Sequence, residues 1–330
     1  MPLLRPAYNP LLPFVTGDWN GNPIGNDNRY LNLDTPGERT FRELLRWQLQ
    51  PNPLRPLKKK QRPGVDVVFN RQLTRDAEDG IAWLGHATFL LRMGGLQLIT
   101  DPVFYNIGPL RRHTPLPCSV SDLHSIDVIL LSHNHRDHAD RRSLQQLCAL
   151  NPRAVICTGL EMKKLLLQWK IPNQVVEAGW FQQYPLDADC TITYLPARHW
   201  SRRGLTDTNE TLWGSFLIQS GSQTVYFGAD SGMGVHFERI GRLFPRIDYA
   251  LLGIGAYMPE WFMHTAHTSP ADALLACRQL GARTLLPMHH ATFDLSDEPL
   301  FYPRQELLRL WEADPAVSVL DAVIGQKYPF

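Results

Sequence analysis

The segment HNHRDH, residues 133–138, constrains the fold of this chain more than any other stretch. It directly follows the apolar run IDVILL of residues 126–131. Such a run predicts a buried strand, and polar side chains at the carboxyl end of a strand in an α/β sheet are typical of a functional site. So many polar groups beside a core would be costly without a partner. The side chains in question are His133, His135, Asp137 and His138.

Imidazole and carboxylate in one loop indicate a transition-metal site, because both suit zinc and its neighbours. A single ion could take His133 and His135, but Asp137 and His138 would then be crowded and unpaired. A pair of ions ~3.5 to 4 Å apart would use them all and needs roughly seven or eight protein ligands. Further ligands must therefore come from elsewhere. Other candidates that follow apolar, β-rich runs are His199, Asp230, His289 and His290. Any one of these alone would be read as a cap or turn residue, but together with the loop they favour the metal site.

The N-terminal part of the chain differs from the rest in composition and in predicted secondary structure. Residues 1–78 are rich in Pro, Asn and Arg, and their only helical periodicity spans residues 40–50. We expect an irregular N-terminal wrap there, not an independent domain. Residues 79–330 alternate β-rich runs with helical patterns and predict one catalytic domain with sheets covered by helices. The basic run of residues 58–62 is read as a solvated linker, with a phosphate or membrane contact as the alternative.

Composition excludes some classes of partner. A net charge of +1, from 33 basic and 32 acidic residues, provides no global field for nucleic acid. The five cysteines are scattered, without a CxxC pair, which favours reduced thiols and a cytoplasmic location. No apolar stretch reaches the ~18 to 20 residues of a spanning helix. A peripheral contact with the inner face of a membrane and a homodimer are left open.

Several longer motifs, taken in order, resemble the metallo-β-lactamase superfamily and, more narrowly, its N-acyl-phosphatidylethanolamine phospholipase D branch. The likeness covers about residues 80 to 300. It implies an α+β fold of the αββα four-layer type with two Zn²⁺ ions, while Mn²⁺ or Fe²⁺ stay open. The motifs are WLGHATFLL, TDPVF, SHNHRDHAD, PARHWSRRG, FGADSG and PMHHATF, with TLWGSF and GIGAYMPEWFM between them.

The resemblance also implies roles for individual residues. The first zinc would be held by His133, His135 and His199, and the second by Asp137, His138 and His289, with Asp230 as the bridge. His289 is preferred to His290 because the family motif places its ligand first in a His-x-x-Thr-Phe string, here HHATF. His290 is then expected to support a ligand or line the cleft.

Other positions concern the cleft. The family branch usually has Tyr where this chain has Arg136 and Gln where it has Ala266, so the resemblance does not fix the head group of the substrate. His267 matches a cleft histidine of the family; its alternative role is to precede a helix capped by Thr268 or Ser269 and opened by Pro270. The expected substrate-binding residues are Arg136, Tyr257, His267 and His290. Arg202 and Arg203 are further candidates for a phosphate clamp, His86 and Asp101 for support of the ligands, and Trp261 and Phe262 for an acyl-chain groove.

These features predict a zinc phosphodiesterase of phospholipase D type, acting on a lipid-like or other amphiphilic phosphodiester. Two zinc ions sharing a water would supply a hydroxide nucleophile, and the expected catalytic residues are Asp137, Asp230 and His267. A lactonase or other carboxylic-ester hydrolase of the superfamily is the alternative. An iron redox protein and a non-catalytic metal-binding module fit the sequence less well.

Overall fold

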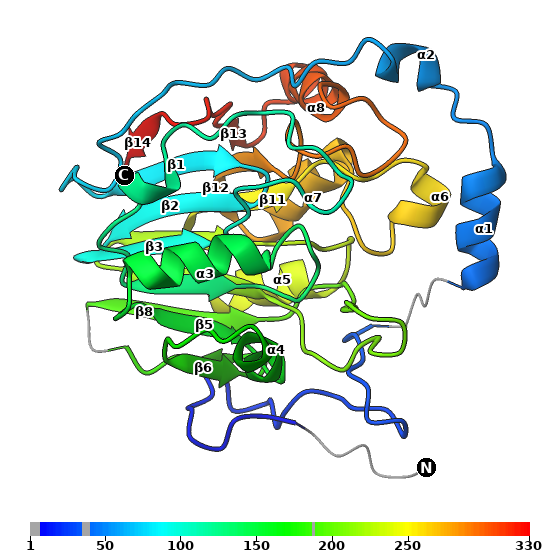
Figure 1. Ribbon diagram of the computed structural model, residues 1–330. Helices are drawn as coiled ribbons and strands as arrows, with labels where there is room; N and C mark the ends of the chain where they lie inside the picture. The colour runs from blue at the N-terminus through cyan, green and yellow to red at the C-terminus, as the bar shows by residue number, and fades with distance from the viewer. Residues whose placement is uncertain (1–6, 35–39, 187–188) are drawn as a thin grey trace.

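The computed structural model describes residues 7–34, 40–186 and 189–330. Two sheets lie face to face, and helices cover their outer faces (Figure 1). The predicted αββα sandwich is therefore confirmed.

The first sheet combines an antiparallel part with a parallel part. β1, β2 and β3 form an antiparallel meander, after which β3, β4, β5 and β6 run parallel. Parallel neighbours need a crossover connection, which α3 supplies between β4 and β5 and α4 between β5 and β6. In spatial order the strands are β14 (Lys327–Pro329), β1 (Gly80–Gly85), β2 (Thr88–Met93), β3 (Leu96–Thr100), β4 (Val128–Leu131), β5 (Val155–Gly159) and β6 (Val175–Ala178).

The second sheet has the same plan. β7 to β10 are antiparallel, and β10 to β13 are parallel. Its spatial order is β13 (Ser318–Val319), β12 (Ala282–Met288), β11 (Ile247–Gly253), β10 (Gln223–Phe227), β9 (Ser215–Ser220), β8 (Cys190–Leu195) and β7 (Gln182–Gln183).

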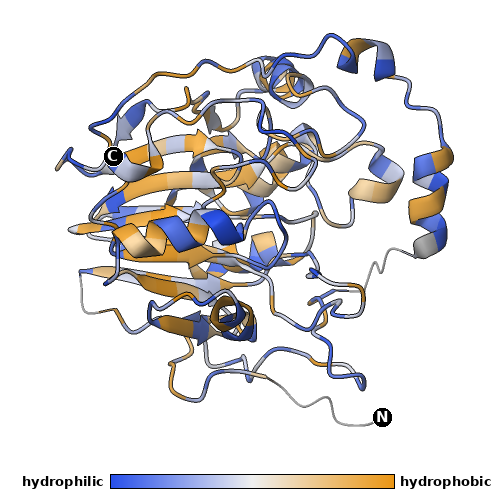
Figure 2. Cartoon of the chain, viewed as in Figure 1, coloured by the Kyte–Doolittle hydropathy of each residue, from blue (hydrophilic) through white to orange (hydrophobic). Residues whose placement is uncertain are grey.

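Alternation of side chains along the strands produces the layers. In β4, Val128 and Leu130 join the core between the sheets, whereas Ile129 and Leu131 join a second cluster under α3 and α4. The strand is apolar at every position because both of its faces are covered. Figure 2 shows the same concentration of hydrophobic residues in the strands.

The helices begin where the sequence provides caps. Asp140 caps α3 by accepting from the amide of Ser143 at 2.8 Å. Ser269 caps α7 with Pro270 in its first turn, as predicted. The helices are α1 (Phe41–Leu49), α2 (Arg55–Lys58), α3 (Arg141–Leu150), α4 (Met162–Gln168), α5 (His236–Leu243), α6 (Glu260–Met263), α7 (Pro270–Gln279) and α8 (Tyr302–Ala313), with a 3-10 turn at Val120–Asp122.

The N-terminal segment runs over the sandwich. The predicted helix of residues 40–50 is confirmed as α1, which follows its N-cap Thr40. Leu12 and Tyr30 are part of the core between the sheets, and the amide of Val68 donates to the carbonyl of Ile324. Residues 1–6 and 35–39 lie outside the described residues. We propose that residues 1–78 form a wrap, so that this segment expressed alone should show no cooperative unfolding transition.

The five cysteines are all free and buried, as expected of reduced thiols. Among the described residues, no helix combines the length and apolar character needed to cross a bilayer.

Candidate metal centre

The loop that follows β4 carries the histidine-rich segment, and its backbone is firmly held. Asp101, at the end of the neighbouring β3, accepts from the amide of Ser132 at 2.8 Å and from its hydroxyl at 2.6 Å. Arg203 donates to the carbonyls of Asn134 and Ala139, both at 2.8 Å. At the far end of the loop, the capped start of α3 fixes the chain again. The loop is therefore anchored on both sides.

The remaining candidates lie at the same place because the strands that precede them point in the same direction. β8 is antiparallel to β9 and β9 to β10, so β8 and β10 point the same way, and β11 and β12 run parallel to β10. The carboxyl ends of β8, β10 and β12 therefore lie at one edge of the sheet. His199, Asp230 and His289 follow these ends.

The histidines and aspartates meet there in groups whose ligand atoms lie within 4.8 Å of one another. Asp230 reaches both main groups: its Oδ2 lies 3.7 Å from Nε2 of His199, and its Oδ1 lies 3.1 Å from Nε2 of His289. The division matches the ligand sets implied by the resemblance, with His86 added to the second. One group contains His133, His135, His199 and Asp230, and the other contains His86, Asp137, His138 and His289.

The buried polar atoms of these groups fit metal ions. Within the described residues, Nε2 of His138, Nε2 of His289 and Oδ1 of Asp230 are buried and form no hydrogen bond of proper geometry. Unsatisfied buried groups are expensive. Convergent nitrogen and carboxylate donors are the set that zinc prefers, so the residues suit a binuclear centre.

The ionisation states of Asp230, His133 and His199 agree with this assignment. Burial alone would raise the pKa of Asp230, but His138 and His289 hold it well below its usual value. Burial lowers the pKa of His133 and of His199 well below the usual value. Ionised carboxylate and neutral imidazole are the forms that bind a metal. Burial alone would lower the pKa of His138 and of His289, but Asp230 and Asp137 raise both, so these two rings release a proton when a metal binds.

Asp101 orients one of the candidate ligands, as the sequence analysis expected. Its Oδ2 lies 2.7 Å from Nδ1 of His138, and both side chains are fully buried. A carboxylate at Nδ1 fixes the ring and leaves Nε2 for the metal. On the other side of the centre, Nδ1 of His199 lies 2.9 Å from the carbonyl oxygen of Ala266.

His86 lies in contact with a candidate ligand, where a supporting residue was expected. Its Nε2 lies 3.1 Å from Oδ2 of Asp137, and its ring is 4.1 Å from that of His289. Both histidines have positive φ, of 55° and 60°, a backbone region that side chains rarely adopt outside constrained sites. The strained backbone aims both rings at Asp137, where His86 supports the carboxylate.

The expected substrate-binding residues are spread around the centre. Nδ1 of His267 lies 3.8 Å from Oδ2 of Asp230, with a side chain that is 14% exposed. Arg136 is exposed and donates to the carbonyl of Arg203 at 3.3 Å. Tyr257 is buried, and its amide lies 3.3 Å from Oε1 of Glu298. The roles of these residues stay predictions.

His290 lies beside the metal groups and belongs to none of them among the described residues. Its ring is buried 5.0 Å from that of Trp83, and burial lowers its pKa to about 3.

Two residues have functions that sequence reasoning missed. Arg203 was a candidate phosphate clamp, but its guanidinium supports the histidine loop; nothing local in its sequence signals this, because the loop is far away in the chain. Ser132 donates to Asp101, and a small polar residue directly before the first histidine could have indicated it.

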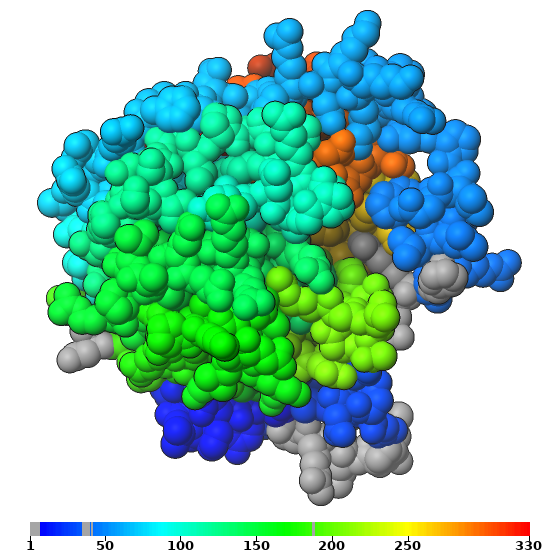
Figure 3. All heavy atoms as spheres, viewed as in Figure 1, coloured from blue at the N-terminus to red at the C-terminus, as the bar shows by residue number. Residues whose placement is uncertain are grey.

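The expected acyl-chain groove is also partly covered. The ring of Phe262 stacks on that of Trp47 at 5.1 Å, and the guanidinium of Arg46 lies 4.5 Å from the Trp261 ring. Helix α1 therefore packs on α6. Figure 3 shows a hollow between α1 and the body of the molecule.

Comparison with known proteins identifies the family. The beta-lactamase superfamily domain matches residues 97–290. The chain is 32% identical over 254 residues to the N-acyl-phosphatidylethanolamine-hydrolyzing phospholipase D 1 of Caenorhabditis elegans, which covers 72% of this chain and 71% of that protein. It is 31% identical over 327 residues to an uncharacterised protein of Mycobacterium tuberculosis, covering 93% of this chain and 84% of the relative.

Among solved structures, the metallo hydrolase Igni18 from the archaeon Ignicoccus hospitalis has a TM-score of 0.60 at 22% identity, covering 76% of this chain and 98% of that one. This likeness concerns the fold. Together with the sequence relatives, it shows that the chain belongs to the metallo-β-lactamase superfamily, in its N-acyl-phosphatidylethanolamine phospholipase D-like branch.

Proposed function

We propose that this member of a superfamily of metal-dependent hydrolases is a zinc phosphodiesterase of phospholipase D type. Its substrate would be an N-acyl phosphatidylethanolamine-like or other amphiphilic phosphodiester. The observation that carries the proposal is the pair of His/Asp groups, with Asp230 3.7 Å from His199 of one and 3.1 Å from His289 of the other. The name of the nematode relative supports the choice of phosphodiester.

The chain provides the groups that this reaction needs. Two cations held by these residues would lower the pKa of a shared water and stabilise the charge that develops on substrate oxygens. Asp137 and Asp230 would orient the attacking water toward phosphorus. His267, beside Asp230 and partly exposed, would donate a hydrogen bond to a phosphoryl oxygen. Arg136 would hold a second oxygen.

The exposed leucines of helix α1 favour an amphiphilic substrate. Leu44, Leu45 and Leu49 are 37%, 47% and 75% exposed, while Trp47 packs on α6. Figure 2 shows hydrophobic and hydrophilic segments alternating along this helix. Arg42 and Arg46 on the same helix, and Lys59 and Lys60 just after α2, suit the headgroups of an anionic bilayer. We infer that this side of the protein contacts the membrane that holds the substrate.

The test is a comparison of substrates on the zinc-loaded protein. We expect hydrolysis of bis(p-nitrophenyl) phosphate and release of a phosphatidic acid from an N-acyl phosphatidylethanolamine, with little turnover of a lactone panel. Lactone turnover without phosphodiester turnover would replace the proposal with a lactonase. No hydrolysis of either class by a fully loaded protein would reject a hydrolase of these substrates.

A further inference from the structure

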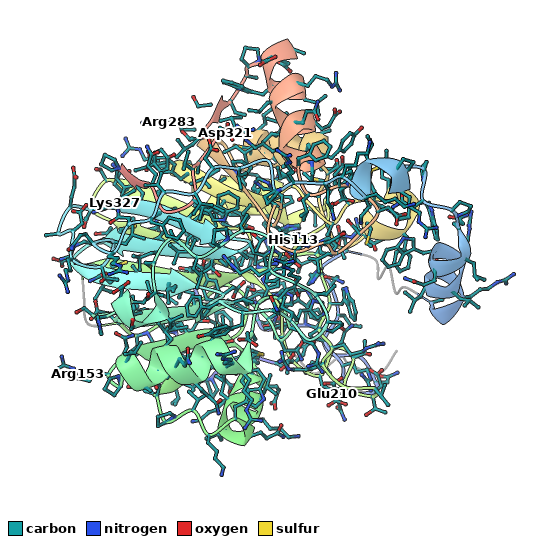
Figure 4. All side chains as sticks on the ribbon, turned by 45° about the horizontal axis from the view of Figure 1, so that its top comes forward. His113, Arg153, Glu210, Arg283, Asp321 and Lys327 are labelled. Carbon is teal, nitrogen blue, oxygen red and sulfur yellow. The ribbon has the colours of Figure 1, made fainter. Side chains whose placement is uncertain are left out.

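A second polar site lies at the amino end of α3. A surface pocket of about 570 Å³ opens there, which is within the size range of small-molecule sites. Among the described residues that line it, none is a predicted metal ligand. Figure 4 shows His113, one of the lining residues, in the middle of the face turned to the viewer. The charged lining residues are Arg111, Arg112, Asp140 and Arg142.

The positive charge of this pocket is available to a ligand. The carboxylate of Asp140 already accepts from the amide and hydroxyl of Ser143, at 2.8 and 2.7 Å. Arg112 donates to three backbone carbonyls and is fixed in the wall. In the part of the chain that the structure describes, no hydrogen bond or ion pair engages the guanidinium of Arg111 or of Arg142. That of Arg142 lies 3.7 Å over the ring of Tyr105, which holds it at the pocket.

The position of Arg142 is unfavourable for the helix alone. Arg141 and Arg142 open α3, and its first turn contains no acidic residue. Cations near a helix N-terminus oppose the helix dipole and destabilise the helix. Because the chain has a net charge of only +1, this concentration of arginines is a local feature. The N-cap carboxylate of Asp140 offsets part of this charge, and an anion held by the arginines would offset more.

The walls supply apolar contacts as well as charge. Phe104, Tyr105 and Leu116 line the pocket with the arginines. The volume exceeds what a bare inorganic anion needs, so an organic group attached to the anion can be accommodated. Guanidinium groups bind phosphate through paired N–H donors.

We propose that this pocket binds a phosphate monoester, with its phosphate between Arg111 and Arg142 and its organic part against Tyr105 and Leu116. This site is separate from the metal centre and does not depend on the substrate proposed above. The pocket is nevertheless connected to the centre. The amide of His113 donates to the carbonyl of Thr292, whose hydroxyl accepts from the amide of His86.

Calorimetric titration of the zinc-loaded full chain with glycerol 3-phosphate, and separately with inorganic phosphate, tests the proposal. The variants are the double substitution Arg111→Gln and Arg142→Gln, the single substitution Arg142→Lys, and the control Arg153→Gln, which lies at the other end of α3 from His113 (Figure 4). Binding at the metal centre is followed independently, as inhibition of the hydrolysis of bis(p-nitrophenyl) phosphate or, if that ester is not turned over, as a change in the absorption spectrum of cobalt-loaded protein.

We expect a binding event in the wild type that weakens at least tenfold in the double variant, less in Arg142→Lys, and not at all in Arg153→Gln. Glycerol 3-phosphate should bind more tightly than inorganic phosphate. The signal from the metal centre and the metal content should stay unchanged in every variant. Equal affinity of the double variant and the wild type, or binding detected at the metal centre alone, would overturn the proposal.

Discussion

The two sheets contribute to the candidate metal centre in different ways. The first sheet provides His133, His135, Asp137 and His138 from one loop after β4. The second provides His199, Asp230 and His289 from the ends of β8, β10 and β12. The first contribution can be read as a motif, because its spacing is local. The second depends on strand direction, which places distant residues at one edge.

The ligands are also supported differently on the two sides. The buried carboxylate of Asp101 orients His138, whereas a backbone carbonyl, that of Ala266, orients His199. A side-chain carboxylate carries negative charge and can be removed by substitution. A backbone carbonyl carries no net charge and remains in every variant. Substitution of the supporting residue should therefore weaken metal binding more for the ligands of the first sheet than for those of the second.

Asp230→Ala should have the largest effect, because the carboxylate of Asp230 lies 3.7 Å from His199 of one group and 3.1 Å from His289 of the other. We expect metal content to fall and hydrolysis to drop by orders of magnitude, measured by elemental analysis and steady-state kinetics. The control Asp248→Ala removes a carboxylate that accepts from Thr224 at the opposite end of the same sheet. An Asp230→Ala protein with wild-type metal content and rate would show that the two sheets do not share this ligand.

Asp101→Asn should have the second-largest effect. The loss of its charge beside His138 should weaken metal binding by about 10- to 100-fold, as seen by competition with a chelator. Asp127→Asn is a matched control, since Asp127 accepts from the amide of Gln97 at the other end of the same strand pair. Equal metal affinity in the Asp101 variant and the wild type would remove the proposed difference between the two sides.

This contrast also explains what the sequence could predict. Individual elements such as β4 and α7 followed from apolar runs and caps, because burial and capping are local signals. The αββα arrangement came from the resemblance to a family. The meeting of His199 with His135 came from the resemblance to a family, since no periodicity connects residues on different sheets. The support of the histidine loop by Arg203 was not foreseen, because it depends on loop geometry that only the folded chain defines. Support by His86 was expected from the sequence.

Arg136→Ala tests the outer side of the first sheet's loop. A lost charge-assisted contact predicts an increase in KM for phosphodiesters of about tenfold, with unchanged metal content and little effect on neutral lactones. Steady-state kinetics on both substrate classes measures it, with Arg141→Ala, at another exposed arginine, as a control. An equal loss on charged and neutral substrates would indicate a disturbed loop, and no loss would leave Arg136 as a surface residue bonded to Arg203.

Helix α1 belongs to neither sheet, so its substitution should spare the metal centre. Leu45→Glu with Leu49→Glu should weaken binding to anionic vesicles by roughly threefold to tenfold in a co-sedimentation assay. Turnover of a water-soluble phosphodiester should not change. Leu167→Glu, on the exposed side of α4, is the matched control. Unchanged vesicle binding would argue against α1 as the membrane contact.

If both sheets together build a binuclear metal centre, the purified protein must bind two metal ions per chain. Purified protein, reconstituted without chelators and analysed by plasma mass spectrometry, should contain about two transition-metal ions per chain, mainly zinc. The absence of bound transition metal under these conditions would contradict the account.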